Sequence, residues 1–182
     1  MSSSGGNTSG LVPTPVGLSL TNTGDALVNA IAAQGELRLA QVYLPFGINV
    51  TALGCQVSAV GDAGCMLTPV IYGLTANGAP GALLHTGATV AGDSIGEHTA
   101  AAAFPLAAGW YWVGILPLLC PVTAPTLRGF DRVPGGMFGG LASFGSGEVR
   151  AVGWIQTGLA APPNPFAGTV SGTPAASIVI ST

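Results

Sequence analysis

Turns recur so often along this chain that long helices do not fit between them. Across residues 36–120, apolar and β-branched runs of five to eight residues alternate with turns such as GDAG at 61–64 and TANGAPG at 75–81. This spacing is typical of sandwiches and barrels. Long stretches with helical period do not separate the runs, so the strands should pair antiparallel rather than through βαβ units. We therefore predict an all-β fold, an antiparallel β-sandwich of the jelly-roll type.

The beginning of the chain differs from the rest. Residues 1–15 are rich in Ser, Gly, Asn, Thr and Pro and have no periodicity, which predicts a flexible, extended arm. They lack the basic and apolar regions of a secretory signal peptide, which favours synthesis in a cytoplasm. Residues 16–182 are predicted to form a single β-sandwich domain. Within it, Asp25–Gln34 has helical character and is expected to be one short helix or a further strand.

The aromatic sequence WYWVGIL at 110–116 predicts the centre of a sheet. Trp110 and Trp112 share one face of this strand, Tyr111 lies on the other, and both faces are apolar. A strand that is apolar on both faces is buried on both, so we expect these three aromatic side chains to lie inside the domain.

The apolar segment 100–122 has about the length of a membrane span. Prolines at 105, 117 and 121 interrupt it and leave no helix longer than about three turns. A buried strand flanked by turns is therefore expected in this segment, and no membrane span.

The three cysteines show no metal-binding or redox spacing. Cys55, Cys65 and Cys120 are odd in number and form no C-x-x-C pair, so neither a disulfide framework nor a zinc site is indicated. If the GDAG turn closes a hairpin, Val60 faces Cys65 and Cys55 lies opposite Val70, too far from Cys65 for a disulfide. We predict three free, buried thiols.

Charged residues are unusually scarce in this sequence. Charged residues make up 6% of the 182 residues, and the chain has no lysine and four arginines, giving a formal net charge of −3. An average globular chain has about 25% charged residues. A surface covered by neighbours tolerates this deficit, because interface cores are depleted in charge; a Ser/Thr/Gly-coated extracellular monomer is the alternative. Four scattered arginines offer no phosphate-binding stripe, so nucleic acid is not an expected partner.

The sequence carries no recognised catalytic motif. His85, Asp93, Glu97 and His98 are the one cluster of residue types that could make a metal or acid–base site. Residues of this kind also occupy ordinary solvated turns between strands, which is the interpretation we favour. We therefore expect no enzymatic activity, no catalytic residue, no cofactor and no metal.

Two Glu/Arg pairs and one Arg/Phe group are the remaining charged features of the sequence. The pairs Glu36/Arg38 and Glu148/Arg150 are each spaced two residues apart, which places both members on one side of a strand, and we expect them to form solvated ladders on outward faces. Arg128, Phe130 and Arg132 form a candidate docking patch, because Arg and aromatic residues are favoured in interface hot spots. A charged loop tip is the alternative for this last group.

One stretch is similar to a known type of domain. It contains an aliphatic–Tyr pair, an x-x-x-G-x-P-G-x-L turn and a later L-x-x-G-x-Y-W sequence. The matching residues are Ile71-Tyr72, Asn77-Gly78-Ala79-Pro80-Gly81-Ala82-Leu83, Leu106, Gly109, Tyr111 and Trp112. Over about residues 37–120 the chain thus resembles β-sandwich modules of tailed-bacteriophage virion proteins, of the decoration, head-fibre or minor tail type. The resemblance implies a structural or adhesive role and specifies no binding residue.

Together these features predict a non-enzymatic virion structural protein, made in the host cytoplasm. It would self-associate, with a trimer as the expected homo-oligomer, and dock on other virion proteins, with the 1–15 arm contributing. The alternative is a carbohydrate- or receptor-binding module at a fibre tip, with a host-surface glycan as partner. Such a module needs solvent-exposed Trp or Tyr, and a polysaccharide-degrading enzyme, the third candidate, needs paired carboxylates.

Overall fold

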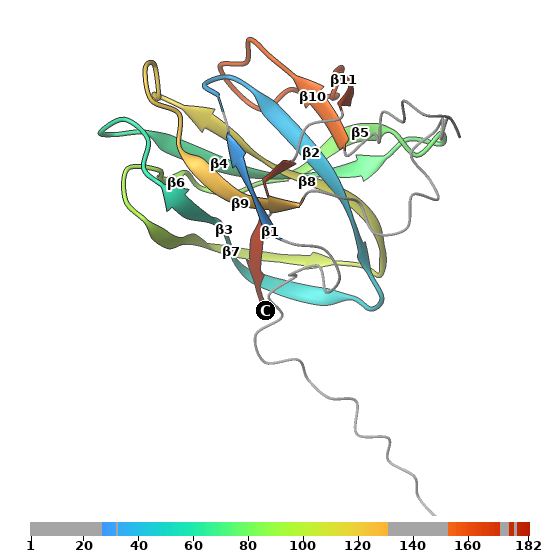
Figure 1. Cartoon of the computed structure of the whole chain (residues 1–182). Helices are drawn as coiled ribbons and strands as arrows, with labels where there is room; N and C mark the ends of the chain where they lie inside the picture. The colour runs from blue at the N-terminus through green and yellow to red at the C-terminus, as the bar shows by residue number, and fades with distance from the viewer. Residues whose placement is uncertain (1–26, 32, 131–152, 172–174, 177) are drawn as a thin grey trace, which may run out of the picture.

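A computed structural model describes residues 27–31, 33–130, 153–171, 175–176 and 178–182 of the chain. In this part of the chain two antiparallel sheets pack face to face and no helix is present (Figure 1). The predicted all-β, antiparallel β-sandwich is confirmed. The arm at residues 1–15, Arg132 and the pair Glu148/Arg150 lie outside the described residues.

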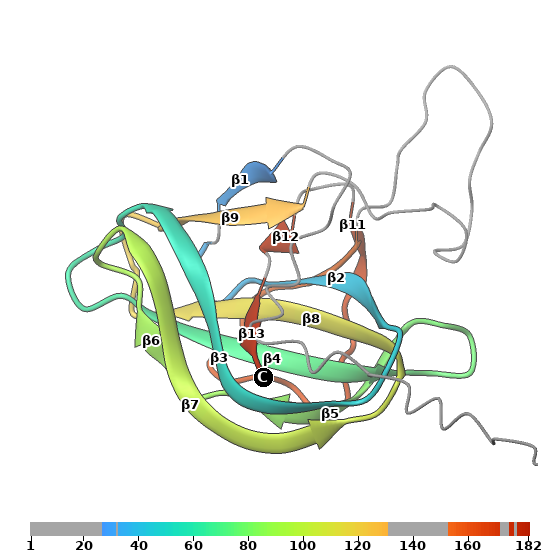
Figure 2. The same cartoon turned by 90° about the horizontal axis from the view of Figure 1, so that it is seen from below.

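We call the two layers sheet A and sheet B. In sheet A, β9 (Thr126–Phe130) lies between β1 (Leu27–Ile31) and β3 (Ile48–Ala59), and β3 also pairs with β7 (Gly96–Leu106) and β13 (Val179–Ser181); β12 (Ala175–Ala176) pairs with β9. Sheet B has the order β11 (Thr169–Ser171), β10 (Gly153–Gln156), β2 (Leu37–Leu44), β8 (Gly109–Leu118), β4 (Met66–Leu74) and β5 (Pro80–Thr86), with β6 (Val90–Ala91) paired to β4. From β2 to β4, and again from β7 to β9, the chain crosses between the sheets at each connection, as in a jelly roll (Figure 2).

Strand β8 is central, as its apolar faces predicted. It pairs with β2 on one side and with β4 on the other. Val113 and Ile115 point into the main core between the sheets, whereas Trp112 points to the opposite face. The apolar segment 100–122 therefore forms the end of β7 and all of β8 rather than a helix. Among the described residues, no helix has the length and hydropathy needed to cross a membrane.

The outer face of sheet B carries a second buried cluster. Trp112, Tyr72 and Leu116 lie in it, and Phe166, from the Pro-rich segment 157–168, covers them. The Tyr72 hydroxyl donates a hydrogen bond to the Pro163 carbonyl at 2.8 Å. This segment thus acts as a roof over the second cluster, which explains how sheet B can be apolar on both sides.

Two local expectations can be compared with the structure. Of the two alternatives for Asp25–Gln34, a short helix or a further strand, the strand is found: its described residues include β1, paired antiparallel with β9. The hairpin expected around the GDAG turn was wrong, because β3 and β4 lie in different sheets. Cys55 therefore pairs with His98 of β7 and not with a residue of β4. The turn carries the chain from one layer to the other.

Candidate docking site

The titratable cluster predicted from the sequence is dispersed in the structure. The His85 ring stacks on Phe104 with ring centroids 3.6 Å apart, and His98 Nε2 lies 2.9 Å from the Ser94 carbonyl oxygen. Asp93 accepts a hydrogen bond from the Gly64 amide at 3.0 Å, and the Glu97 side chain is exposed. Nowhere in the described ranges do three or more His, Cys, Asp or Glu side chains gather as metal ligands would.

The structure covers the predicted docking patch only in part. Arg128 lies in β9 opposite Asn29 and is half-buried, so it belongs to a paired strand rather than to a loop tip. The backbone of Phe130 pairs with Leu27 on one side and with Ala175 on the other. Arg132 lies outside the described residues, so the three-residue patch stays a prediction. Glu36 and Arg38 form an ion pair, but the expectation of a solvated pair on an outward face was wrong: the two side chains are 15% and 20% exposed, and Arg38 lies opposite Ile115 of the main core.

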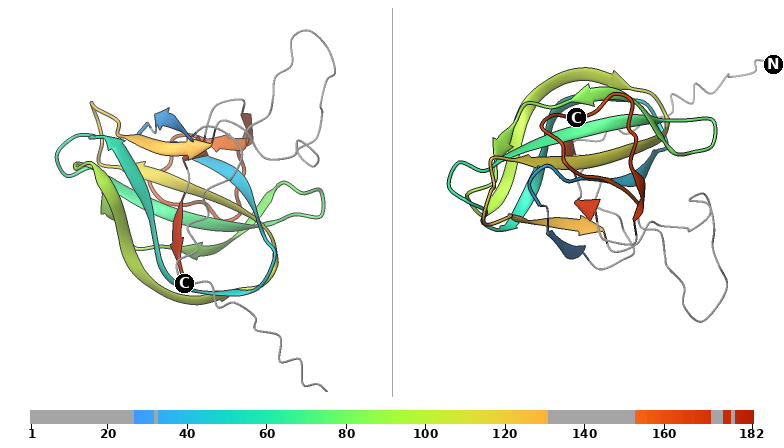
Figure 3. Two further views of the ribbon diagram at one scale, coloured as in Figure 1. Left: turned by 60° about the horizontal axis from the view of Figure 1, so that its bottom comes forward. Right: turned by 90° about the horizontal axis from the view of Figure 1, so that it is seen from above.

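Three turns that are distant in the sequence gather at one end of the sandwich, a grouping that we did not predict from the sequence. They connect β3 to β4 (residues 60–65), β6 to β7 (92–95) and β8 to β9 (119–125), and we call them together the loop end (Figures 2 and 3). Backbone hydrogen bonds join the first two: Gly61 N–H donates to the Gly92 carbonyl at 2.9 Å, and Gly92 N–H donates to the Cys65 carbonyl at 2.8 Å.

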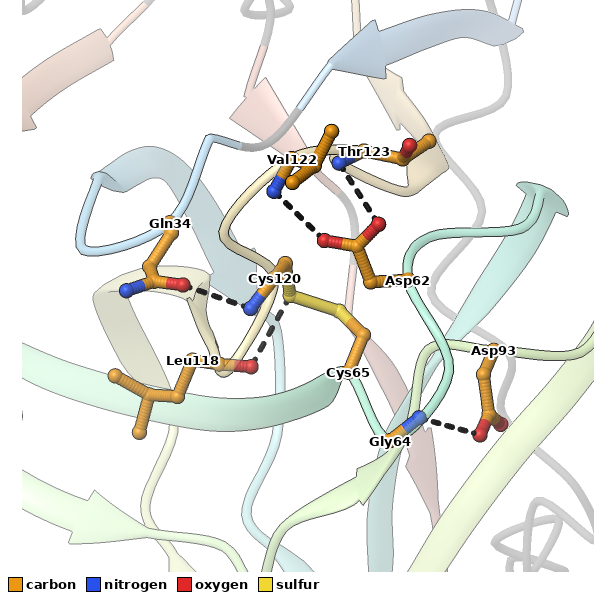
Figure 4. Close-up of a disulfide and its surroundings, with 9 residues drawn as sticks. All are labelled: Gln34, Asp62, Gly64, Cys65, Asp93, Leu118, Cys120, Val122 and Thr123. Atoms are coloured by element: carbon orange, nitrogen blue, oxygen red, sulfur yellow. Dashed lines mark hydrogen bonds between the residues drawn. A yellow bond between two sulfur atoms is a disulfide. The ribbon is translucent and has the colours of Figure 1, made fainter.

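Asp62 ties the third turn to the first. Its two carboxylate oxygens accept hydrogen bonds from the Val122 amide at 2.7 Å and from the Thr123 amide at 3.0 Å (Figure 4). Its own amide donates to the Thr123 carbonyl at 3.0 Å. Hydrogen bonds from these two backbone amides favour the ionised carboxylate and lower the pKa of Asp62.

A disulfide between Cys65 and Cys120 also crosses this end, with the two Cα atoms 4.8 Å apart (Figure 4). The prediction of three free thiols was therefore wrong, although the narrower prediction that Cys55 and Cys65 are not bonded is confirmed. The reason is strand pairing: Met66 faces Leu118 across β4 and β8, so the residues just beyond them meet. No spacing in the sequence marks this pair.

Cys55 is the buried free thiol of the main core. Burial disfavours the thiolate and raises the pKa of Cys55 to about 12. Its sulfur is therefore a small apolar group at neutral pH and a poor nucleophile.

The loop end exposes large apolar side chains. Val122 is 89% exposed, Ile95 70% and Leu119 64%, and Val60 of the first turn is also exposed. Leu119 has a φ of 57°, a left-handed conformation that is costly for a bulky residue. The amide of the following residue, Cys120, donates a hydrogen bond to the Gln34 side chain at 2.8 Å. This bond helps to hold Leu119 in its left-handed conformation. These side chains are thus presented on fixed backbone rather than on a loose loop.

The loop end contains few charged residues. Its turns contain two charged residues, Asp62 and Asp93, and no Lys or Arg. Both carboxylates accept hydrogen bonds from backbone amides of the loop end itself. The surface combines exposed apolar groups with few charged residues, which suits an interface core.

At the opposite end of the sandwich, the expectation that Trp110, Tyr111 and Trp112 are all buried needs correction. Trp112 is buried as predicted, but Trp110 is 39% exposed and Tyr43 beside it is 50% exposed. Tyr111 is half-buried, and its hydroxyl donates a hydrogen bond to the Ala107 carbonyl at 2.9 Å. Trp110 remains partly exposed because it lies at the start of β8, beyond the roof formed by segment 157–168.

Comparison with known proteins adds no relative: no family model matches the chain, and a search of curated proteins finds none with significant similarity.

Proposed function

We propose that this chain is a non-enzymatic structural protein of a virion, a capsid decoration, head-fibre or minor tail component, that self-associates and docks on a larger particle. The observation that carries the proposal is the loop end: three turns cross-linked by Asp62 and the Cys65–Cys120 disulfide that expose Ile95, Leu119 and Val122. Exposed apolar groups on a fixed backbone lose little conformational entropy on binding.

We propose further copies of the same chain as the occupant of the loop end, with a trimer as the stoichiometry. Copies meeting at an axis bring identical surfaces close together, and like charges there would repel. The turns of the loop end contain two charged residues per copy, Asp62 and Asp93, so few like charges would meet there. The charge-poor sequence of the whole chain supports the same proposal.

The experiment compares the full-length chain with Val122→Ser and Ile95→Ser in light scattering at micromolar concentration. Val170→Ser is the matched control, because Val170 is also an exposed valine but lies on β11. We expect an oligomer for the wild type and the control and a shift toward monomer for both loop-end variants. A monomeric wild type, or an oligomer that all three variants leave intact, would refute self-association through the loop end.

Docking on the particle needs a separate measurement. Particles lacking the protein are mixed with the full chain or with a form that lacks residues 1–15, and bound protein is quantified. We expect specific rebinding that weakens without the arm, because a partner's groove can supply the contacts that offset the entropy cost of ordering a low-complexity segment. Rebinding that is equal with and without the arm would remove the arm from the proposal, and the absence of any rebinding would remove the virion role.

A further inference from the structure

Tyr43 and Trp110 form an exposed aromatic pair at the end of the sandwich opposite the loop end. They are direct cross-strand partners in β2 and β8, and their ring centroids lie 4.8 Å apart with the planes tilted by 43°. The connections from β2 to β3, from β4 to β5 and from β7 to β8 lie at this end (Figures 1 and 2). Half of the Tyr43 surface and more than a third of that of Trp110 remain accessible to solvent.

The aromatic pair lies beside a raised polar turn. Trp112, two residues after Trp110 on the same face, is covered, and its Nε1–H donates a hydrogen bond to the Gly78 carbonyl at 3.0 Å. Residues 75–79 therefore stand over Trp112 at the border of the exposed pair. Two hydrogen bonds brace this turn, from Thr75 N–H to the Ala79 carbonyl at 2.8 Å and from Gly78 N–H to the Thr75 carbonyl at 2.9 Å.

The chemistry at this end is neutral. The sequence has no Asp, Glu, Lys, Arg or His within 39–49, 75–82 or 105–116. Gln41 precedes Tyr43 by two residues and so belongs to the same face, and the Asn77 side chain is exposed on the turn. Amide side chains both donate and accept hydrogen bonds. A ligand for this end should thus offer an apolar face for the rings and neutral hydroxyl groups beside it.

The two rings match a small ligand better than a protein partner. An aromatic side chain has about 150–250 Å² of surface to bury, so the accessible parts of Tyr43 and Trp110 amount to roughly 200 Å². A stable protein interface needs about 800 Å² from each partner, so a protein would need further contacts, for example with Phe46, which is 45% exposed in the connection from β2 to β3. A single sugar ring fits the area of the two rings alone.

We propose that Tyr43 and Trp110 are a binding platform for a neutral hexopyranose unit of a glycan. The C–H face of a pyranose ring packs on the aromatic rings, and its equatorial hydroxyls reach the amide and backbone groups of Gln41 and of the turn at 75–79. The proposal does not depend on the loop end or on a virion role. With the platform at one end and the loop end at the other, a docked protein would present its platform outward.

The test uses the full-length chain on an array of neutral, sialylated and sulfated glycans, followed by titration calorimetry with the neutral glycans that bind. We expect saturable binding to neutral glycans with a dissociation constant of about 1 mM or tighter. Tyr43→Ala and Trp110→Ala should each weaken it about tenfold or more, whereas Trp110→Phe, which keeps an aromatic face, should lose less. Val170→Ser, an exposed position on β11 outside both proposed sites, is the control and should bind as the wild type does.

Three results would overturn the proposal. The first is no binding to any neutral glycan of the array, and the second is binding that requires a charged sugar. The third is binding that Tyr43→Ala and Trp110→Ala leave unchanged while their thermal melting matches the wild type. Light scattering on the same two variants separates this site from self-association: a loss of oligomer in them would assign the pair to a protein interface instead. Failure of the loop-end variants to change the oligomer would leave the glycan proposal standing.

Discussion

Trp110 and Trp112 point to the same face of β8, yet Trp112 is 3% exposed and Trp110 39%. The difference lies in what covers them. Phe166 and the turn that carries Gly78 lie over Trp112 and stop short of Trp110. Two tryptophans in neighbouring positions of one strand therefore have different roles, one in packing and the other at the surface.

Truncating the two tryptophans should separate these roles. Trp112→Ala removes a large buried side chain and should lower the free energy of unfolding by about 3–5 kcal/mol. Trp110→Ala should cost about 1 kcal/mol, as for a half-exposed position. Urea unfolding followed by circular dichroism measures both. Equal losses for the two variants would contradict the different burial of the two side chains.

The number of reactive thiols should depend on folding and on reduction. Native protein treated with an alkylating reagent without reductant should remain unlabelled, because Cys55 is buried with its pKa raised to about 12 and the other two cysteines are bonded. Denaturant should expose one thiol, and denaturant with reductant three. Intact mass spectrometry counts the labels, with Cys55→Ala as the control that should drop the middle value to none. Three labels in denaturant alone would exclude the disulfide.

Asp62 should contribute to stability at neutral pH and lose that contribution in acid. Its pKa is lower in the folded chain than in the unfolded chain, so the ionised form stabilises the fold. The contribution is complete above the unfolded value of about 4 and declines as the pH falls through the lower folded value. Asp62→Ala should therefore be most destabilised relative to wild type at pH 7, and the gap should narrow below about pH 4. A gap that does not change with pH would show that the carboxylate charge is not what stabilises the turn.

His85 should produce a second, milder pH dependence. Burial against Phe104 lowers the pKa of His85, so the folded protein favours the neutral ring. Its stabilising effect is complete above about pH 6.5, the unfolded value, and declines as the pH falls toward the folded value. His85→Phe keeps an aromatic ring next to Phe104 and should flatten the melting temperature between about pH 7 and 5. An unchanged slope in this variant would assign the dependence to other groups.

The fold class could be predicted because local signals carry it. Turn residues at short intervals and alternating apolar positions were enough to predict antiparallel sheets, and apolar residues on both faces of 110–116 were enough to place β8 at the centre. Strand partners could not be predicted in the same way. The GDAG turn has the residues of a hairpin turn, but it connects β3 in one sheet with β4 in the other. Which partner a strand takes depends on contacts distant in sequence.

Both candidate sites depend on such distant contacts. The roof at 157–168 lacks any periodicity, so the sequence did not reveal that Phe166 covers Trp112 and leaves Trp110 exposed. The pairing of Cys65 with Cys120 follows from the neighbouring positions of β4 and β8, which the sequence did not predict. Exposed apolar residues in three separate turns became a surface only when the fold brought the turns together.

The Cys65–Cys120 bond also determines how the protein would respond to force. A pull applied at the two ends of the chain bypasses the stretch between Cys65 and Cys120, which are 55 positions apart, because the load passes through the two sulfur atoms. That stretch contains β4 to β8. Without the bond it would release about 190 Å of extended chain. Oxidised protein should therefore lengthen less than reduced protein under tension, with the strands outside the bond, β1 to β3 and β9 to β13, as the part that yields.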